Sequence, residues 1–375
     1  MPAPVPAPAR PPRARPAGAR DRALASELSR WFARSARPLP WRTTPRDPYR
    51  SLVSELMLQQ TQVARVVPSF ERFVSRFPTL AHLADADSQE VIALWSGLGY
   101  YRRARTLQAA ARTLAAPGAP PTLFPTTVPA LRALPGIGPY TAGALASIVF
   151  GRPEPAVDGN VARVLLRLHA RPGPPADPAT RRWLWRRAAQ LVRAAPDPAA
   201  FNEGLMELGA LICTPRSPAC GSCPIAAACA ARRRGAQDSI PAPKPRPVRT
   251  QLHCASALIT GPAGVLLERR PPRAGLWSDM WQVPTLESAA RAPSLRRLAQ
   301  AVNTAPPTGR APPPLTFTCT TSSREVHFRV WRLEAPATPR RGQWVAPDAL
   351  AGLALSSPQR RILASLARRP DTSTP

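Results

Sequence analysis

The chain has 375 residues, and 51 lysines and arginines against 22 acidic residues give a formal net charge of +29. A surplus of this size repels itself unless a polyanion offsets it, so nucleic acid is the leading candidate partner. Arginine-rich codon usage would explain why Lys244 is the sole lysine, but not why acids are scarce. No apolar run approaches the ~20 residues of a membrane span, so an anionic membrane surface is only a weaker alternative.

The first part of the chain is predicted to be all-α, without internal repeats. Residues 1–20 are basic and proline-rich without an apolar core, which predicts a disordered arm rather than a secretory signal. Apolar residues then recur at helical spacing over 21–35 and 47–77, with Asp47 and Pro48 as a helix start. Short Pro or Gly breaks separate the further predicted helices: 88–95, 101–115, 127–134, 139–150, 158–169, 179–194 and 198–212.

The sequence pattern changes from helical to strand-like after a predicted linker. Residues 232–251 are proline-rich and charged, without apolar periodicity. Short runs rich in β-branched or aromatic residues follow, such as "LHCASALIT", "GVLLERR", "LTFTCTT" and "VHFRVWRLE". They predict a small α+β domain over 252–367, and 368–375 is expected to be a disordered tail.

One motif, "LPGIGPYTAGA" at 134–144, predicts two helices joined at Gly136-Ile137-Gly138. Such a helix-hairpin-helix brings backbone N–H groups and a helix N-terminus close to a phosphate, which grips DNA without reading its sequence. A tight interhelical turn without any ligand is the alternative. Composition and spacing alone support the two equally.

Four cysteines lie within seventeen residues: Cys213, Cys220, Cys223 and Cys229, spaced C-x6-C-x2-C-x5-C. Four thiolates this close can hold one metal centre, and the chain is expected to be intracellular, which disfavours disulfides. The spacing alone leaves zinc and iron–sulfur equally open. Cys254 and Cys319 have no partners at metal spacing and are expected to be ordinary buried thiols.

The hairpin, together with "SELMLQQTQV", "LWSGLGYYRRAR" and "VDGNVARVL", resembles MutY-type adenine DNA glycosylases of the helix-hairpin-helix superfamily. The resemblance covers about residues 24–235 and is weaker up to 365. It implies an all-α glycosylase domain (21–231) whose four cysteines hold a 4Fe–4S cluster, followed by a smaller α+β Nudix-like domain. It also implies a monomeric base-excision repair enzyme of the bacterial cytoplasm, associated with the nucleoid. Its implied substrate is double-stranded DNA, from which it removes adenine mispaired with 8-oxoguanine or guanine.

Glu55 and Asp158 are the predicted catalytic pair, because two carboxylates can divide the labour of cleaving a glycosidic bond. Glu55 has apolar helix neighbours, so burial is expected to raise its pKa and keep it able to protonate the purine. Asp158 is expected to stay ionised near a helix N-terminus, where it stabilises or attacks the oxocarbenium-like sugar. Without the resemblance, an exposed helix glutamate and a simple N-cap would explain them.

The resemblance implies further roles. Tyr140 stands where related lyases carry a nucleophilic lysine, and a phenol cannot form a Schiff base, so the enzyme is expected to be monofunctional; simple packing of the hairpin remains open. Tyr140 and Asn160 are expected to bond to Asp158 and the sugar region. The expected adenine pocket comprises Arg37, Trp41, Arg42, Leu58 and Glu203, and the expected wedges into the DNA stack are Gln60, Leu98 and Tyr100.

Residues 264–287 resemble the Nudix-like domain of the same family, which recognises 8-oxoguanine. The stretch after Glu287 lacks the acid cluster of Nudix hydrolases, so this domain is expected to bind rather than catalyse. Thr321-Ser322-Ser323 replaces the family's Phe-Ser-His loop, and only Ser322 keeps a group able to bond the lesion.

Two other functions remain as rivals. One is a pyrimidine-directed glycosylase or endonuclease III-like lyase, which "LMLQQTQV" and the C-terminal domain disfavour. The other is a non-catalytic DNA-binding protein, which the presence of both Glu55 and Asp158 disfavours.

Overall fold

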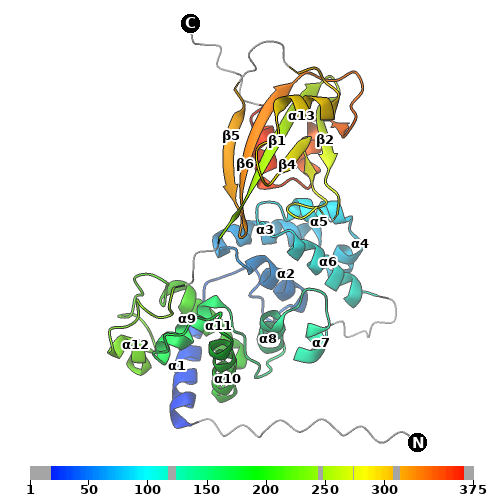
Figure 1. The fold of residues 1–375 in the computed structure, drawn as a ribbon. Coiled ribbons are helices and arrows are strands. Elements are labelled where there is room, and N and C mark those ends of the chain that lie inside the picture. Colours follow the sequence, from blue (N-terminus) through cyan, green and yellow to red (C-terminus); the bar gives the residue numbers. More distant parts are fainter. Residues whose placement is uncertain (1–17, 117–123, 244–247, 273, 307–312, 367–375) are drawn as a thin grey trace, which may run out of the picture. The chain divides into compact units, whose positions relative to one another are not determined.

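The computed structural model describes residues 18–116, 124–243, 248–272, 274–306 and 313–366. Residues 1–17 of the expected arm, Lys244 and the expected tail lie outside the described residues. The chain divides into two compact units, Met1–Glu55 with Pro120–Lys244, and Leu56–Ala119 with Pro245–Pro375 (Figure 1). This division differs from the domain boundaries expected from sequence, which stay predictions.

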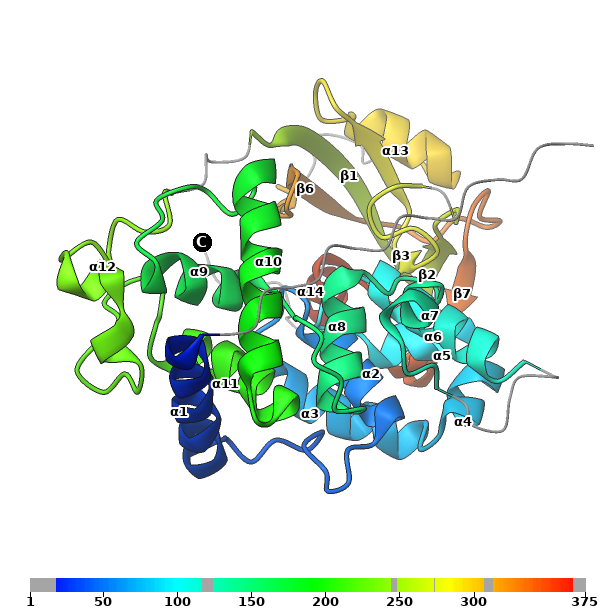
Figure 2. The same ribbon diagram turned by 90° about the horizontal axis from the view of Figure 1, so that it is seen from below.

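The first unit is helical, as predicted. Its helices are α1 (Ala19–Ser35), the start of α2 (Pro48–Leu58), α7 (Val128–Arg132), α8 (Pro139–Ile148), α9 (Gly159–Leu168), α10 (Pro178–Ala194), α11 (Pro198–Leu211), the short 3-10 helix η1 (Ala226–Ala228) and α12 (Ala230–Arg233). α11 packs against α1, α8 and α9, and α10 covers α1 and α9 (Figure 2). α9 and α11 are therefore central to this unit.

Three of these helices have an aspartate as their N-cap. Asp158, Asp177 and Asp197 are the N-caps of α9, α10 and α11, and each accepts hydrogen bonds from backbone N–H groups of the first turn. Those N–H groups have no partner within the helix, so the carboxylates satisfy them. The predicted helix starts are confirmed at these three positions to within one residue.

The helical pattern predicted over 47–77 is confirmed, but it does not lie on one continuous helix. The structure has two helices there, α2 and α3 (Val63–Arg76), with a turn between them. Gln60 in that turn has φ of 57°, in the left-handed region that a helix cannot continue through. Apolar periodicity runs across the turn, which is why the pattern alone did not reveal it.

The second unit combines helices with a mixed seven-stranded sheet. Its helices are α3, α4 (Leu80–Asp85), α5 (Ser88–Leu94), α6 (Arg102–Leu114), α13 (Leu295–Val302), the short η2 (Asp348–Gly352) and α14 (Ser357–Ala364). Its strands are β1 (Thr250–Gly261), β2 (Gly264–Arg269), β3 (Trp281–Gln282), β4 (Thr285–Ser288), β5 (Leu315–Thr320), β6 (Arg324–Leu333) and β7 (Gln343–Val345). The main order is β3-β2-β1-β6-β5; β4 pairs with β1 and β7 with β2. β1 and β6 run parallel, and the other pairs are antiparallel.

Both faces of this sheet are buried. Leu252, Cys254 and Leu258 of β1 belong to the same core cluster as Ile362 of α14. The alternate residues Ala255, Ala257 and Ile259 belong to a second cluster with Leu298 of α13. A strand covered on both faces reads as a continuous apolar run rather than an alternation, which explains the "CASALI" of β1.

The expected linker is partly packed. Ile240 is buried in the core of the first unit, and its carbonyl accepts a hydrogen bond of 2.7 Å from Arg167 Nε. β1 begins at Thr250, before the expected linker ends. The prolines and charged residues predict an extended linker, but the side chain and the carbonyl of Ile240 hold part of it against the first unit.

Candidate active site and cysteine pocket

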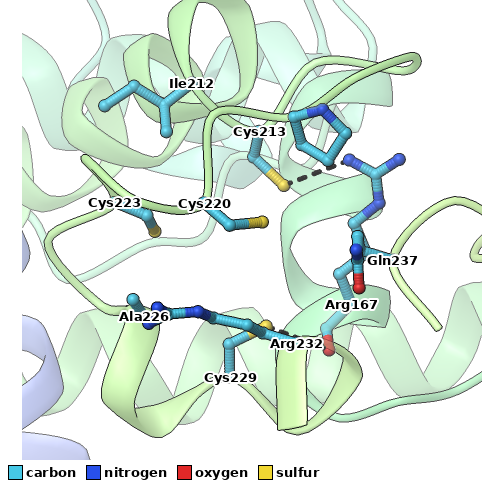
Figure 3. A pocket seen from close by; sticks show the side chains of 10 residues that line it. Arg167, Ile212, Cys213, Cys220, Cys223, Ala226, Cys229, Arg232 and Gln237 are labelled. Atoms are coloured by element: carbon cyan, nitrogen blue, oxygen red, sulfur yellow. Dashed lines mark hydrogen bonds between the residues drawn. The ribbon is translucent and has the colours of Figure 1, made fainter. Parts of the chain in front are cut away.

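The four spaced cysteines line a single pocket. Figure 3 shows Cys213, Cys220, Cys223 and Cys229 around the pocket, with Arg167 of α9 along one side and its guanidinium next to Cys213. Arg167 Nη1 lies 3.4 Å from Cys213 Sγ, and Cys229 Sγ lies 3.6 Å from the Arg167 carbonyl oxygen. The arginine side chain and its own carbonyl thus contact two of the four cysteines.

The donor set fits an iron–sulfur cluster. Burial and the neighbouring thiols raise the pKa of Cys223 to about 11, so the sulfurs lie close enough to interact. Within the described residues, no group of three or more His, Cys, Asp or Glu side chains is arranged so that it could hold a metal ion as it stands. Four cysteine sulfurs facing one pocket are nonetheless the ligands that such clusters take. Cys254 is buried in β1 of the second unit, and Cys319 in β5 is half-buried.

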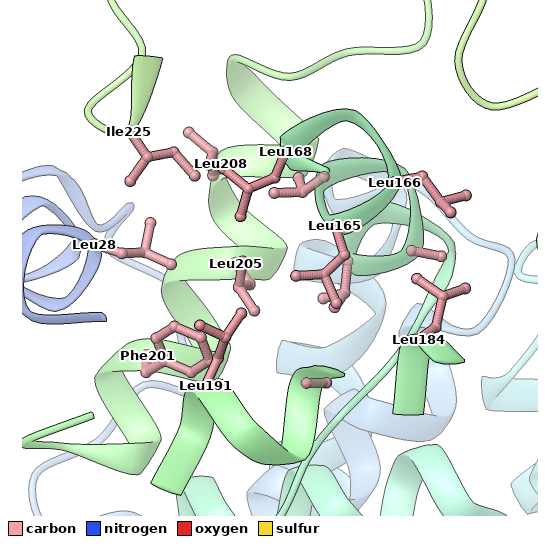
Figure 4. Packing of buried hydrophobic residues seen from close by; sticks show 14 of the residues in the cluster. Leu28, Leu165, Leu166, Leu168, Leu184, Leu191, Phe201, Leu205, Leu208 and Ile225 are labelled. Atoms are coloured by element: carbon pink, nitrogen blue, oxygen red, sulfur yellow. The ribbon is translucent and has the colours of Figure 1, made fainter. Parts of the chain in front are cut away.

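The cysteine loop shares its core with the helices that carry the polar site. Figure 4 shows Ile225 of the loop beside Leu208 and Leu205 of α11, Leu165 of α9 and Leu28 of α1. All of them are at most 5% exposed. The loop and both helices are therefore one packed body.

α11 comes unusually near to the start of α9. A Cβ built on Gly209 would stand 2.6 Å from Asn160 Cβ, closer than real side chains approach. Glycine is therefore required at this position for the two helices to meet.

Asp158 is held from two sides at the start of α9. Its Oδ1 accepts from the Val161 amide at 2.7 Å, and its Oδ2 accepts from Asn160 Nδ2 at 3.1 Å. The expected contacts to a helix N-terminus and to Asn160 are both present. Burial raises the pKa of Asp158, while the donors of Val161 and Asn160 oppose that rise. The rise works against the fully ionised form expected from sequence, and the donors limit it.

Asp158 is also linked to the cysteine loop through Arg163, a residue that the sequence reasoning missed. Arg163 Nη2 donates to Asn160 Oδ1 at 2.9 Å and to the Gly209 carbonyl at 2.8 Å. Its Nε donates to the Cys213 carbonyl at 2.7 Å. A chain of hydrogen bonds thus runs from Cys213 through Arg163 and Asn160 to Asp158. Only the spacing of Arg163, three residues after Asn160 on one helix, hinted at it.

Glu55 is buried on α2, with 9% of its surface exposed. Burial raises the pKa of its carboxyl to about 7; a hydrogen bond from Tyr140 opposes this, and the carboxylates of Asp158 and Glu203 add to it. Its Oε2 atom has no hydrogen-bond partner among the described residues. The predicted burial and raised pKa are confirmed, so this carboxyl gains and loses its proton near neutral pH.

Tyr140 has a different partner from the expected one. Its hydroxyl is hydrogen-bonded to Glu55 and lies 3.3 Å from Met206 Sδ. Asp158 acts on it only through its charge: burial and the charges of Glu55 and Asp158 hold the pKa of Tyr140 well above its usual range. The expectation of a bond to Asp158 is therefore wrong. Sequence spacing could place Tyr140 on α8 but could not tell which carboxylate it faces.

The arginines of the expected adenine pocket form an ion-pair network with two glutamates of α11. Arg37 binds Glu207 through two nitrogens at 2.7 and 2.8 Å. Arg42 binds Glu203 at 2.9 Å and Glu207 at 3.2 Å, and Arg46 binds Glu203 at 2.6 Å. Burial opposes ionisation of Glu207, but Arg37 and Arg42 hold its pKa at about 2. Arg46 and Glu207 were missed, although Glu207 follows Glu203 by one helical turn.

The remaining predicted residues lie elsewhere in each unit. Gly136 has φ of 74° in the hairpin, and Gly138 is the N-cap of α8. In the second unit Gln60 and Tyr100 are exposed while Leu98 is buried. Trp41 in the first unit is buried, Leu58 in the second is half-buried, and Ser322 is exposed at the β5–β6 turn. Their contacts with DNA stay predictions.

Three parts of the chain match known protein families. Residues 53–190 match the HhH-GPD superfamily base excision DNA repair protein, residues 213–229 the iron-sulfur binding domain of endonuclease III, and residues 255–365 the NUDIX domain. The chain therefore contains a helix-hairpin-helix region, an iron–sulfur binding region and a Nudix region. Within the described residues, no helix has both the length and the apolar character that crossing a membrane needs.

Two curated relatives make the assignment more specific. The chain is 32% identical over 322 residues to the adenine DNA glycosylase of Schizosaccharomyces pombe, covering 69% of this chain and 68% of that one. It is 44% identical over 226 residues to the human adenine DNA glycosylase, covering 58% and 41%. The chain belongs to the adenine DNA glycosylase family. It spans less than half the length of the human, mouse and rat relatives.

A solved structure supports the helical fold. The structure of a thermostable thymine-DNA glycosylase aligns with a TM-score of 0.50 and 27% identity. It covers 57% of this chain and 98% of that chain.

Proposed function

We propose that this protein excises adenine mispaired with 8-oxoguanine or guanine in double-stranded DNA, by hydrolysing the N-glycosidic bond. The observation that carries the proposal is the pair of carboxyl groups of buried Glu55 and half-buried Asp158, which interact electrostatically in the first unit. Their environments differ: Glu55 has an unpartnered oxygen, whereas both oxygens of Asp158 accept hydrogen bonds. Two carboxyl groups in unlike surroundings are the arrangement that divides acid and anionic roles.

Glu55 would act as the general acid. An adenine leaves readily only when a ring nitrogen is protonated, and a carboxyl with a pKa of about 7 can give up its proton near neutral pH. The Tyr140 hydroxyl, bonded to Glu55, would orient the carboxyl so that its free oxygen faces the purine.

Asp158 would meet the positive charge that develops on the sugar as the base departs. Its position is fixed before substrate binds, so no reorganisation is needed in the transition state. It would either stabilise the oxocarbenium-like sugar or attack it, after which water yields the abasic site. An iron–sulfur cluster, when bound, would tie the cysteine loop together through four thiolate ligands; Arg163 joins that loop to Asn160 and so supports Asp158.

The reaction would stop at the abasic site. A lyase needs an amine nucleophile, and the hairpin carries Tyr140 at the corresponding place. The sole lysine, Lys244, lies outside the described residues. Borohydride added during turnover is expected to trap little or no protein–DNA adduct; strong trapping at Lys244 or at the N-terminal amine would overturn the monofunctional assignment.

The opposing base would be read in part by the Nudix-like region. Ser322 at the exposed β5–β6 turn offers a hydroxyl to the edge of 8-oxoguanine, and the wedges Gln60 and Tyr100 would fill the space left by the extruded adenine.

The direct test incubates the protein with duplexes bearing A:8-oxoguanine, A:G, A:T and T:G pairs, followed by alkali to cleave abasic sites. Cleavage at adenine in the first two duplexes is expected. Thymine excision is the second candidate, because the similar solved structure is a thymine-DNA glycosylase. Cleavage only at T:G would favour that candidate, and no cleavage in any duplex would favour a non-catalytic DNA-binding protein.

A further inference from the structure

One buried arginine of the second unit touches two separate segments of the chain at once. Arg103, the second residue of α6, is 7% exposed. Its Nη1 donates to the carbonyls of Leu56, Met57 and Gln59 at 2.8, 2.8 and 2.5 Å. Its Nη2 donates to Thr61 Oγ1 at 3.1 Å and to the carbonyls of Leu98 and Gly99 at 3.1 and 3.0 Å.

The first segment is the C-terminal end of α2 and the turn after it. The last carbonyls of a helix have no partner within it and carry partial negative charge, so a buried cation there is stabilising. The second segment is the loop before α6. Thr61 adds a direct link between the two, because its hydroxyl lies 3.4 Å from both the Gln59 and the Leu98 carbonyls.

Each segment carries a residue in an unfavourable backbone conformation. Gln60 has φ of 57° and Tyr100 has φ of 47°, and neither is a glycine. Such conformations cost free energy and persist only where surrounding contacts impose them. The bound carbonyls of Gln59 and Gly99 immediately precede these two residues, and the Arg103 guanidinium carbon also lies 5.5 Å from the Tyr100 ring centroid.

We propose that Arg103 is a positioning residue that sets Gln60 and Tyr100 together, so that both side chains are presented as one preformed wedge. This inference rests on the proposed function, in which these exposed side chains enter the DNA stack. A guanidinium offers donors on two nitrogens in a fixed fork, so one group can hold two segments in register. A lysine keeps the charge but has one donor nitrogen and cannot span both.

The first test needs no substrate. Amide hydrogen exchange is measured on the full-length protein and on Arg103→Lys. Faster exchange is expected in both 56–62 and 96–101, with the helices of the first unit unchanged. The matched control is Arg112→Lys, because Arg112 lies on the same helix and binds the carbonyls of Ala84 and Ala86. Unchanged exchange in either segment of Arg103→Lys would overturn the proposal.

The second test measures the wedge itself. Single-turnover excision of adenine opposite 8-oxoguanine, with enzyme saturating, is expected to fall about 10²-fold in Arg103→Lys, the scale of a small misplacement. A 2-aminopurine next to the target should show correspondingly less unstacking. Thr61→Val, which removes one shared contact, should change both readouts in the same direction but less.

The outcomes separate the two proposals. If the wild-type protein excises adenine and Arg103→Lys does so equally fast, the positioning role is wrong. If the wild-type protein excises nothing, the proposed function fails, while hydrogen exchange still decides whether Arg103 holds both segments.

Discussion

The first turn of α9 and the β5–β6 turn each present a polar group expected to face DNA, but they are built differently. Asp158 at the start of α9 is half-buried: it accepts from the Val161 amide and from Asn160, and Arg163 in turn holds Asn160. Ser322 is exposed in a turn closed by Thr321 and Arg324, whose hydrogen bonds form a local loop. The difference fits the proposed roles: a charge that stabilises a transition state works best when it is fixed in advance, whereas a group that reads a base can adjust to it.

The largest effect is expected from removing the charge of Asp158. Asp158, with Asn160 and Arg163 at the start of α9, is called the fixed site below. Asp158→Asn keeps the size of the side chain and one oxygen for the Val161 amide but removes the charge proposed to face the sugar, so excision should fall about 10²–10³-fold. Asp177→Asn is the matched control, because Asp177 caps α10 with the same 2.7 Å contact to a backbone amide. Equal, small losses in both variants, measured under single-turnover conditions, would reduce Asp158 to a helix cap.

Burial of the Glu55 carboxyl should make the free energy of unfolding depend on pH. Its pKa is about 7 when folded against 4.5 when exposed, so the folded state binds the proton more tightly. Stability from this group is therefore greatest below pH 4.5 and is lost as pH rises to about 7, by ~3 kcal/mol in total. Glu55→Gln should raise the free energy of unfolding at pH 8 and have little effect near pH 4.5. Urea unfolding at both pH values measures this, and an equal effect at both would show that Glu55 is not titrating as described.

Gly209 offers a way to loosen the fixed site without touching its polar atoms. In Gly209→Ala the new methyl would meet Asn160, so α9 must shift and excision should fall about 10-fold by misplacement of Asp158. Gly204→Ala on the same helix meets the Leu28 and Phe32 side chains instead. If the two variants lose the same activity in proportion to their stability, the contact with Asn160 has no special role.

A substitution in the exposed β5–β6 turn should give the smallest effect. Ser322→Ala removes one hydroxyl, so the preference for adenine opposite 8-oxoguanine over guanine should drop by ~1 kcal/mol, about fivefold. Ser323→Ala, also exposed in the same turn, is the control. An unchanged ratio of the two excision rates in Ser322→Ala would mean that this hydroxyl does not read the lesion.

Much of the site around Glu55 and Asp158 could be predicted from sequence because the patterns that indicate it are local. Glu55 has apolar helix neighbours, and Asp158 precedes a helix with Asn160 two residues on; both patterns survive in the structure. The sheet was also predictable, since strands covered on both faces leave continuous apolar runs.

The rest depends on tertiary contacts that leave no local trace. Arg103 and Arg163 hold carbonyls on distant segments, yet 51 basic residues give no sign of which arginines are buried. Tyr140 was placed on the right helix and paired with the wrong carboxylate, because orientation depends on how α8 packs against its neighbours. Such partners follow from packing, which single-sequence patterns do not encode.

The most direct test of the central claim compares the wild-type protein with Glu55→Gln on an A:8-oxoguanine duplex, measuring binding and single-turnover excision in parallel. The amide keeps the size of the side chain but cannot donate an acidic proton. Binding should change little while excision falls at least about 10²-fold. Excision by Glu55→Gln at close to the wild-type rate would contradict the account, because the buried carboxyl would then not be the acid that releases adenine.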